Sequence, residues 1–122
     1  LSVLLRCRCL HIHLNNTDSS VSLLSSSSYQ LPPSGRTYIE LQTKYTNDFA
    51  IGVKAVNNGV VSPETYIQIF TNTSDWTYLY QDITTLLVNL NADAYVFFIQ
   101  SSKYTNVSSS DVYIDNFKVL TF

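Results

Sequence analysis

Charged residues are scarce in this chain of 122 residues. Lys, Arg, Asp and Glu together make up 13% of the sequence, and the formal net charge is −2. Typical soluble domains contain about 25% charged residues. A nucleic-acid-binding protein needs clustered Lys and Arg side chains to neutralise phosphates, and seven basic residues in a weakly acidic chain do not supply them. The composition therefore argues against nucleic acid as a partner.

Glycine is also rare, with three occurrences. The sequence has no glycine-rich phosphate loop, no Gly-x-Ser-x-Gly motif and no His-Glu-x-x-His motif. A Ser-His-Asp arrangement is not favoured, because both histidines fall in one predicted strand among aliphatic residues. Acidic pairs such as Asp75 and Asp82 have nothing that places them across a cleft, as a glycosidase requires. We therefore expect a protein that is not an enzyme.

No apolar run approaches the roughly 18 residues of a membrane-spanning helix, so no integral membrane segment is predicted. Methionine is absent and the chain begins at Leu1. We expect a processed protein, an excised fragment or a sequence incomplete at its N-terminus. Arg6 and Arg8 follow the apolar start where a secretion signal would show small residues, so this start is interpreted as structure.

The residues that are abundant favour strands. Nine Tyr, six Phe and one Trp accompany many Val and Ile, and no window keeps a helical period. Apolar and polar residues alternate at Tyr38–Tyr45, where Ile39 and Leu41 face one way, and at Phe49–Val56, before a turn at Asn57-Asn58-Gly59. Further strands are expected at 65–71, 76–83, 95–100 and 111–122, with a short helical turn or irregular crossover at 84–90.

This pattern predicts an all-β fold. About eight strands without an internal repeat indicate one domain over residues 1–122, a two-sheet antiparallel β-sandwich of the jelly-roll type. Two sheets that each have one apolar face bury those faces against each other.

The first 37 residues are harder to interpret. Arg6 and Arg8 share the parity of Leu10, so one regular strand would put charges and aliphatic side chains on the same face. We expect a strand over Ser2–Leu14 with a bulge near Cys9 or Leu10, because one extra residue reverses the alternation.

Two segments are similar to strands of a known family. Residues 111–122, DVYIDNFKVLTF, resemble the "vyiDNvkv" final strand of secreted β-jelly-roll domains of the galactose-binding type, and residues 75–84, DWTYLYQDIT, resemble the "dWkkiyidLt" strand of the same group. The group contains many carbohydrate-binding modules and many C-terminal domains of bacterial surface lipoproteins of the Bacteroidetes type. The resemblance implies that Trp76 anchors an edge of the sandwich while Leu79 and Ile83 fill its core.

Sugar-binding sites usually combine an exposed aromatic ring, which stacks on the sugar, with amide or carboxyl groups that hydrogen-bond its hydroxyls. The outward parity of the predicted strands offers Tyr78, Tyr80, Tyr66, Gln68, Tyr38 and Gln42, and the predicted loops offer Trp76, Tyr104 and Asn106. The alternative is that these tyrosines cover a sheet that faces solvent or a partner, because tyrosine is abundant in strands for packing reasons alone.

The resemblance also points to a structural calcium ion at Asp115. In several jelly-roll carbohydrate-binding families a carboxylate of the final strand helps to hold calcium together with backbone carbonyls of the first strand. Calcium takes about six to eight oxygen ligands, and Asp111 and Glu40 are the residues that could join Asp115. The alternative is that Asp115 caps a strand end or accepts backbone hydrogen bonds. No other cofactor is expected.

Cys7, Cys9, His11 and His13 share one parity and are residue types that bind zinc. Alternate residues of a strand lie ~6.5–7 Å apart, whereas zinc holds its ligand atoms at ~2.0–2.3 Å, so at most two of the four fit one ion without a sharp bend. The same spacing disfavours a disulfide between the two cysteines. We expect both to be free thiols, buried as small hydrophobic residues.

These observations favour a noncatalytic carbohydrate-binding-like module of a secreted or cell-surface protein, such as a lipoprotein, with a glycan as its ligand. The alternative is a structural or adhesive subunit of an extracellular assembly or filament. In that case the tyrosine-rich face and the N-terminal strand contact neighbouring surface-protein subunits. Low charge and a high content of Tyr, Ser and Asn suit both functions.

Overall fold

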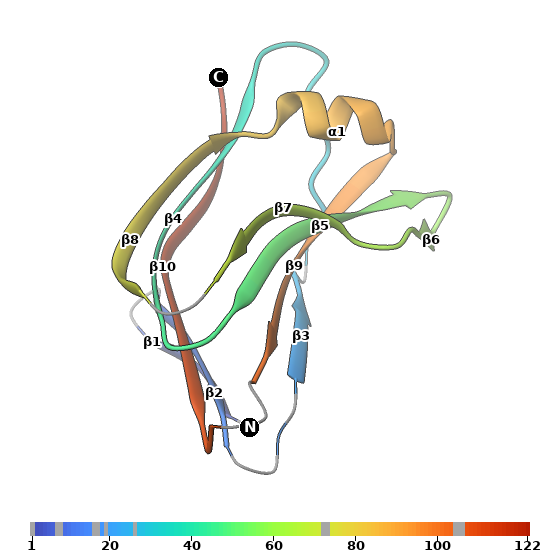
Figure 1. The fold of residues 1–122 in the computed structure, drawn as a ribbon. Coiled ribbons are helices and arrows are strands. Elements are labelled where there is room, and N and C mark those ends of the chain that lie inside the picture. The colour runs from blue at the N-terminus through green and yellow to red at the C-terminus, as the bar shows by residue number, and fades with distance from the viewer. Residues whose placement is uncertain are drawn as a thin grey trace.

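The strands form two antiparallel sheets that pack face to face (Figure 1). The computed structural model describes residues 2–6, 9–15, 18, 20–25, 27–71, 74–103 and 107–122, and the side chains of 2–6 and 74 are not among the described parts. Sheet A has the strand order β1-β2-β10-β4-β8, and sheet B has the order β3-β9-β5-β6, with β7 also paired to β5.

Sheet A consists of β1 (Ser2–Arg6), β2 (Cys9–Leu14), β10 (Ser110–Thr121), β4 (Thr37–Tyr45) and β8 (Ser74–Asp82). Sheet B consists of β3 (Ser20–Leu24), β9 (Ala94–Ser102), β5 (Phe49–Asn57), β6 (Val60–Val61) and β7 (Thr65–Phe70). The two-sheet antiparallel sandwich predicted from the sequence is therefore confirmed.

Alternation along β4 shows how the sequence builds the core. Ile39 and Leu41 are fully buried between the sheets, whereas Tyr38, Glu40 and Gln42 lie on the opposite face, as predicted. Both sheets contribute to one hydrophobic core, whose largest fully buried side chains are Tyr95, Ile12, Ile39, Leu41, Ile51, Ile83, Leu87, Val53 and Val112.

The helix α1 (Thr84–Leu90) lies at one end of the sandwich and connects β8 to β9 (Figure 1). Leu87 points into the core, and its carbonyl oxygen accepts a hydrogen bond of 2.5 Å from the hydroxyl of the buried Tyr95. Asn91 ends the helix in the left-handed conformation, with φ of 48°. Of the two alternatives expected at 84–90, a short helical turn and an irregular crossover, the structure has the helical turn.

The expected single strand over Ser2–Leu14 is wrong. Residues 2–6 and 9–14 form two antiparallel strands, with Ser2 opposite His13 and Arg6 opposite Cys9. The registers of Cys9–Leu14 against β1 and β10 show no shift, so the bulge expected near Cys9 or Leu10 is absent from the described residues.

Strand β7 does not keep the regular alternation that would put Ile67 and Ile69 on one face. The register between β5 and β7 shifts between Ile51 and Gly52, so the alternation of β7 is interrupted. Ile67 and Phe70 are buried, and Ile69 is exposed.

The last strand, β10, contains a β-bulge after Asp115. The register against β4 shifts between Asp115 and Lys118, and Asn116 has a φ of 54°. In a regular strand Val119 would face outward like Asp115. The extra residue of the bulge reverses the alternation, so Val119 faces the core opposite Ile39.

In the described part of the chain, no helix is both long and apolar enough to cross a membrane.

We predict that Leu87→Ala destabilises the fold by about 2–5 kcal/mol, because it leaves a cavity where α1 meets the core. Val88→Ala, at the exposed neighbouring position of the same helix, should change stability by less than about 0.5 kcal/mol. Urea unfolding of both variants measures the difference. Similar losses for the two variants would contradict the packing of α1 described above.

Asp82 precedes α1 and should make stability depend on acid pH. Hydrogen bonds from the side chain and backbone of Thr84, and then the contact with Arg36, lower the pKa of its carboxyl to about 2. The ordinary pKa of Asp is about 3.9, so the stabilisation is present above pH ~4 and is lost as the pH falls toward 2.

In thermal unfolding, Asp82→Asn should therefore lower the midpoint at pH 6 relative to the parent protein, and the gap should narrow at pH 2. A gap that stays constant between the two pH values would show that the charge of Asp82 does not stabilise the fold.

Candidate functional site

Three aromatic side chains project from alternate positions of the edge strand β8. Trp76, Tyr78 and Tyr80 are 53%, 57% and 47% exposed, and they lie on the face of sheet A that is turned away from the core. Alternate residues of a strand point to the same side, so the sequence of β8 puts these rings in a row. Contiguous exposed aromatic surface of this kind is typical of binding sites.

Neighbouring strands extend this row across the sheet. Tyr38 of β4 stacks on Tyr80, with ring centroids 4.9 Å apart and planes 11° apart. Tyr113 of β10 lies 6.5 Å from the ring of Trp76. We call the surface formed by Tyr38, Trp76, Tyr78, Tyr80 and Tyr113 the aromatic face.

Polar groups lie among these rings. The hydroxyl of Tyr78 donates a hydrogen bond of 2.5 Å to Oε2 of Glu40, and Nζ of Lys118 lies 3.9 Å from Oε1 of the same carboxylate. The amide of Asn116 donates to Oε1 of Gln42 at 3.4 Å. Carboxylate and amide groups beside exposed rings are the combination that a sugar needs.

The structure divides the residues that the sequence predicted for ligand binding. Tyr78, Tyr80, Tyr38 and Gln42 come together on sheet A. Trp76 joins them, because it lies within β8, two residues after the start of the strand. Tyr66 and Gln68 lie on β7 of sheet B, where the Tyr66 hydroxyl donates to Oε1 of Gln100 at 3.2 Å. Tyr104 and Asn106 fall outside the described residues.

A cavity of about 670 Å³ opens elsewhere, between the strands β3 and β9 of sheet B and β10 of sheet A. Its lining is mainly apolar, with Ser25, Asn116 and Lys118 as the polar exceptions. A sugar presents many hydroxyl groups that require partners, so the aromatic face suits a glycan better than this cavity does.

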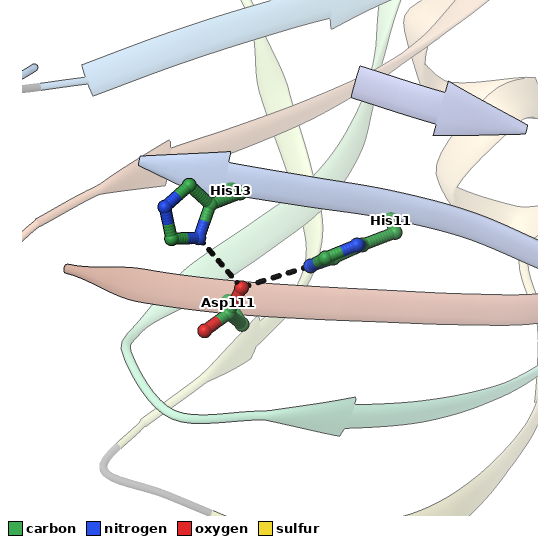
Figure 2. A group of neighbouring side chains, drawn as sticks. All are labelled: His11, His13 and Asp111. Atoms are coloured by element: carbon green, nitrogen blue, oxygen red, sulfur yellow. Dashed lines mark hydrogen bonds and ion pairs between the residues drawn. The ribbon is translucent and has the colours of Figure 1, made fainter. Parts of the chain in front are cut away.

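At the end of the sandwich remote from α1, two histidines and an aspartate converge. Figure 2 shows His11 and His13 of β2 pointing toward the carboxylate of Asp111 on β10. Nε2 of His11 and Nδ1 of His13 each lie 2.8 Å from the same oxygen, Oδ1 of Asp111. The register pairs Asp111 with His13 and Tyr113 with His11.

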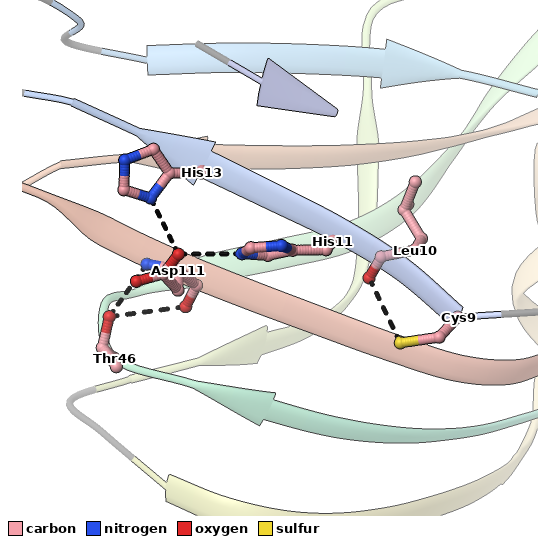
Figure 3. A network of polar contacts seen from close by, with 6 residues as sticks. All are labelled: Cys9, Leu10, His11, His13, Thr46 and Asp111. Carbon is pink, nitrogen blue, oxygen red and sulfur yellow. Dashed lines mark hydrogen bonds and ion pairs between the residues drawn. The ribbon is translucent and has the colours of Figure 1, made fainter. Parts of the chain in front are cut away.

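Two further contacts hold this cluster in place. The backbone NH of Asp111 donates to Oγ1 of Thr46 at 2.9 Å, as Figure 3 shows. The backbone NH of Thr46 donates to the carbonyl of Asp111, also at 2.9 Å. The ring of His11 stacks on Tyr113, with centroids 4.1 Å apart and planes 11° apart. Burial raises the pKa of the Asp111 carboxyl, but the hydrogen bonds from His11 and His13 outweigh it, so the pKa lies below its ordinary value.

Sequence reasoning missed both Tyr113 and the meeting of the histidines with Asp111. The shared outward parity of Cys9, His11 and His13 was the available signal for one side of the cluster. The partner lies on a distant strand, because His11 and Asp111 are 100 positions apart in the sequence. Spacing along one strand does not reveal such a partner.

Asp115 and Cys9 lie opposite each other on the same outer surface of sheet A. Cys9 is a free thiol that is half-buried. Burial raises the pKa of this thiol, and the negative charge of Asp115 raises it further by a smaller amount. Cys7 lies outside the described residues. Of the proposed co-ligands of calcium, Asp111 accepts hydrogen bonds from the histidines and Glu40 accepts one from Tyr78. A calcium ion at Asp115 stays a prediction.

Solved structures of carbohydrate-binding modules have a similar fold. A mutant of CBM29-2, a family 29 module, in complex with cellulohexaose has a TM-score of 0.57 and 14% identity, over 98% of this chain and 74% of that one. Family 16 carbohydrate-binding module 2 has a TM-score of 0.53 and 20% identity, over 91% and 76%. A CBM4 structure has a TM-score of 0.56 and 12% identity, over 98% and 88%.

No protein-family model matches the chain, and no curated protein sequence matches it. The identities to the solved structures are low, so the similarity is one of fold. The chain has the β-sandwich fold of carbohydrate-binding modules, which confirms the fold class and the jelly-roll resemblance predicted from the sequence.

Glu40 should control the ionisation of Tyr78. The pKa of the Tyr78 phenol is raised, mainly by its hydrogen bond to Glu40. Burial and the negative charge of Glu40 contribute less. Glu40→Gln removes that charge, so the pKa should fall toward the ordinary value of about 10. A pH titration followed by NMR of the tyrosine ring carbons measures the change, with Tyr78→Phe to assign the signal. Glu64→Gln, in a loop of sheet B, is the control, and an equal fall there would contradict this assignment.

Proposed function

We propose that the protein is a noncatalytic carbohydrate-binding module whose ligand, an extended glycan chain, lies on the aromatic face of sheet A. The observation that carries the proposal is the row of exposed rings at Trp76, Tyr78 and Tyr80 on one strand. Rings on alternate residues lie ~6.5–7 Å apart, so one extended chain contacts several of them. Each ring offers an apolar surface on which a sugar stacks.

Hydrogen bonding then orients the sugar on these rings. Glu40 and Gln42 lie between β8 and β10 on β4, and their side chains reach the same outer surface. Glu40 is already fixed by Tyr78 and faces Lys118, so an acceptor and a cation are available beside the rings without large rearrangement. Groups that are held in place before binding lose little entropy when a ligand arrives.

The fold supports this proposal, because carbohydrate-binding modules of three families have it. One of those structures contains cellulohexaose, which makes this oligosaccharide a suitable first probe. We also propose that the domain belongs to a secreted or cell-surface protein, such as a lipoprotein. The glycan is the partner that this function requires.

We predict that Trp76→Ala and Tyr78→Ala each weaken glycan binding by about 2 kcal/mol, or roughly 30-fold in Kd, because aromatic anchors usually dominate a binding site. Isothermal titration with cellulohexaose measures the change, and a glycan array identifies a tighter ligand where one exists. Circular dichroism checks that both variants remain folded.

The matched control is Tyr66→Ala, which removes an exposed tyrosine from the outer surface of sheet B. It should leave glycan affinity unchanged. Loss of binding in the Tyr66 variant, with full affinity in the two β8 variants, would place the ligand on sheet B and overturn the proposal.

A structural or adhesive subunit is the second candidate function. Its support is the short edge strand β6, where Val60 and Val61 are both exposed, since exposed apolar edges are available for pairing between chains. If no glycan on the array binds and sedimentation shows oligomers that grow with protein concentration, assembly would replace glycan binding as the function.

A further inference from the structure

We propose that His11, His13 and Asp111 form a binding site for a divalent transition-metal ion, with zinc as the natural candidate. These three side chains are the group of His, Cys, Asp or Glu in the described part of the chain whose ligand atoms lie within 4.8 Å of one another. The site does not depend on the proposed glycan function.

The donor atoms suit this class of metal. Imidazole nitrogen binds zinc, copper and nickel well, whereas calcium prefers an all-oxygen shell of about six to eight ligands. Two imidazoles and one carboxylate are a common set for zinc, which leaves a fourth tetrahedral position for water or another ligand. The chemistry of the cluster therefore selects a transition metal over calcium.

The geometry requires little movement. Two nitrogens bound to zinc at ~2.0–2.1 Å lie roughly 3.4 Å apart in a tetrahedral arrangement. The two histidine nitrogens already point at one oxygen from 2.8 Å each, as Figure 2 shows. Small rotations of both rings bring the nitrogens and the carboxylate around a common centre.

The hydrogen bonds of the two histidines to Asp111 are compatible with metal binding at the same atoms. An ionised carboxylate only accepts hydrogen bonds, so Nε2 of His11 and Nδ1 of His13 both carry hydrogen in the present contacts. A bound metal replaces those two hydrogens, and the other nitrogen of each ring then carries the hydrogen. The metal takes the central position between the rings and the carboxylate, and its positive charge is compensated by Asp111.

The cluster is also held in place by its surroundings. Thr46, shown beside Asp111 in Figure 3, fixes the backbone of Asp111 through hydrogen bonds on both its NH and its carbonyl. The ring of Tyr113 supports one face of the His11 ring. Such supporting contacts orient metal ligands and raise affinity. The side chains remain accessible, with 27% of His11, 35% of His13 and 27% of Asp111 exposed, so an ion can enter from solvent.

The test is zinc titration of the protein carrying no affinity tag, after treatment with a chelator. Isothermal titration should show one zinc ion bound per chain. His11→Ala, His13→Ala and Asp111→Asn should each weaken binding by about 100-fold or more, because even the loss of a supporting contact costs about 10–100-fold. Thermal unfolding shows which variants are folded.

Two controls separate this site from its neighbours on the same surface. Asp115→Asn and Cys9→Ser alter the adjacent carboxylate and thiol, and both should keep the affinity of the parent protein. Electron paramagnetic resonance of the copper-loaded parent protein should show splitting from two imidazole nitrogens, a readout that does not depend on any variant being folded.

Failure of the parent protein to bind zinc or copper with a 1:1 stoichiometry would overturn the proposal. Binding that survives in all three ligand variants, or that is lost in Cys9→Ser, would also overturn it, since the metal would then be held by other residues. Because the glycan titration uses different variants, the two proposals fail independently.

Discussion

The packing of the two sheets against each other is the constraint on which the rest of the structure depends. Ile39, Leu41, Val112 and Ile114 are buried against sheet B, and in a strand each inward side chain forces its neighbours outward. The residues between them on β4 and β10 therefore form the outer surface of sheet A. The core thus determines which side chains meet a ligand, and the binding surface follows from the same alternation that stabilises the fold.

Strand β10 has the central role in that surface, because it pairs with β2 on one side and β4 on the other. Its outward residues join two chemically different regions. Tyr113 lies between Trp76 of the aromatic face and His11 of the histidine cluster. The aromatic face proposed to bind a glycan and the histidine cluster proposed to bind a metal thus share one continuous surface, although different side chains form each of them.

Local patterns made much of the fold predictable. Alternation revealed the buried and exposed faces of β4, and the turn after β5 was visible because Asn58 and Gly59 readily adopt the positive φ that it requires. What depends on pairing between distant strands was not visible. Outward parity indicated Tyr66 as well as Tyr78, but parity alone does not show that the two belong to different sheets. The reversal between β1 and β2 was hidden for a related reason. A change of parity along the sequence can come from a bulge or from a reversal of the chain, and only the pairing of the strands distinguishes the two.

The position of β10 also affects how the chain reaches its native state. Its neighbours β2 and β4 lie far upstream, so the contacts of Asp111 with His13 and Thr46 close loops of 98 and 65 residues. Such non-local pairings cost much chain entropy before they become favourable, and sheets built on them fold slowly. Until β10 docks, β2 and β4 each expose an unpaired edge. The strand that completes both candidate binding regions is therefore also the one that protects the folding chain from associating with other copies of itself.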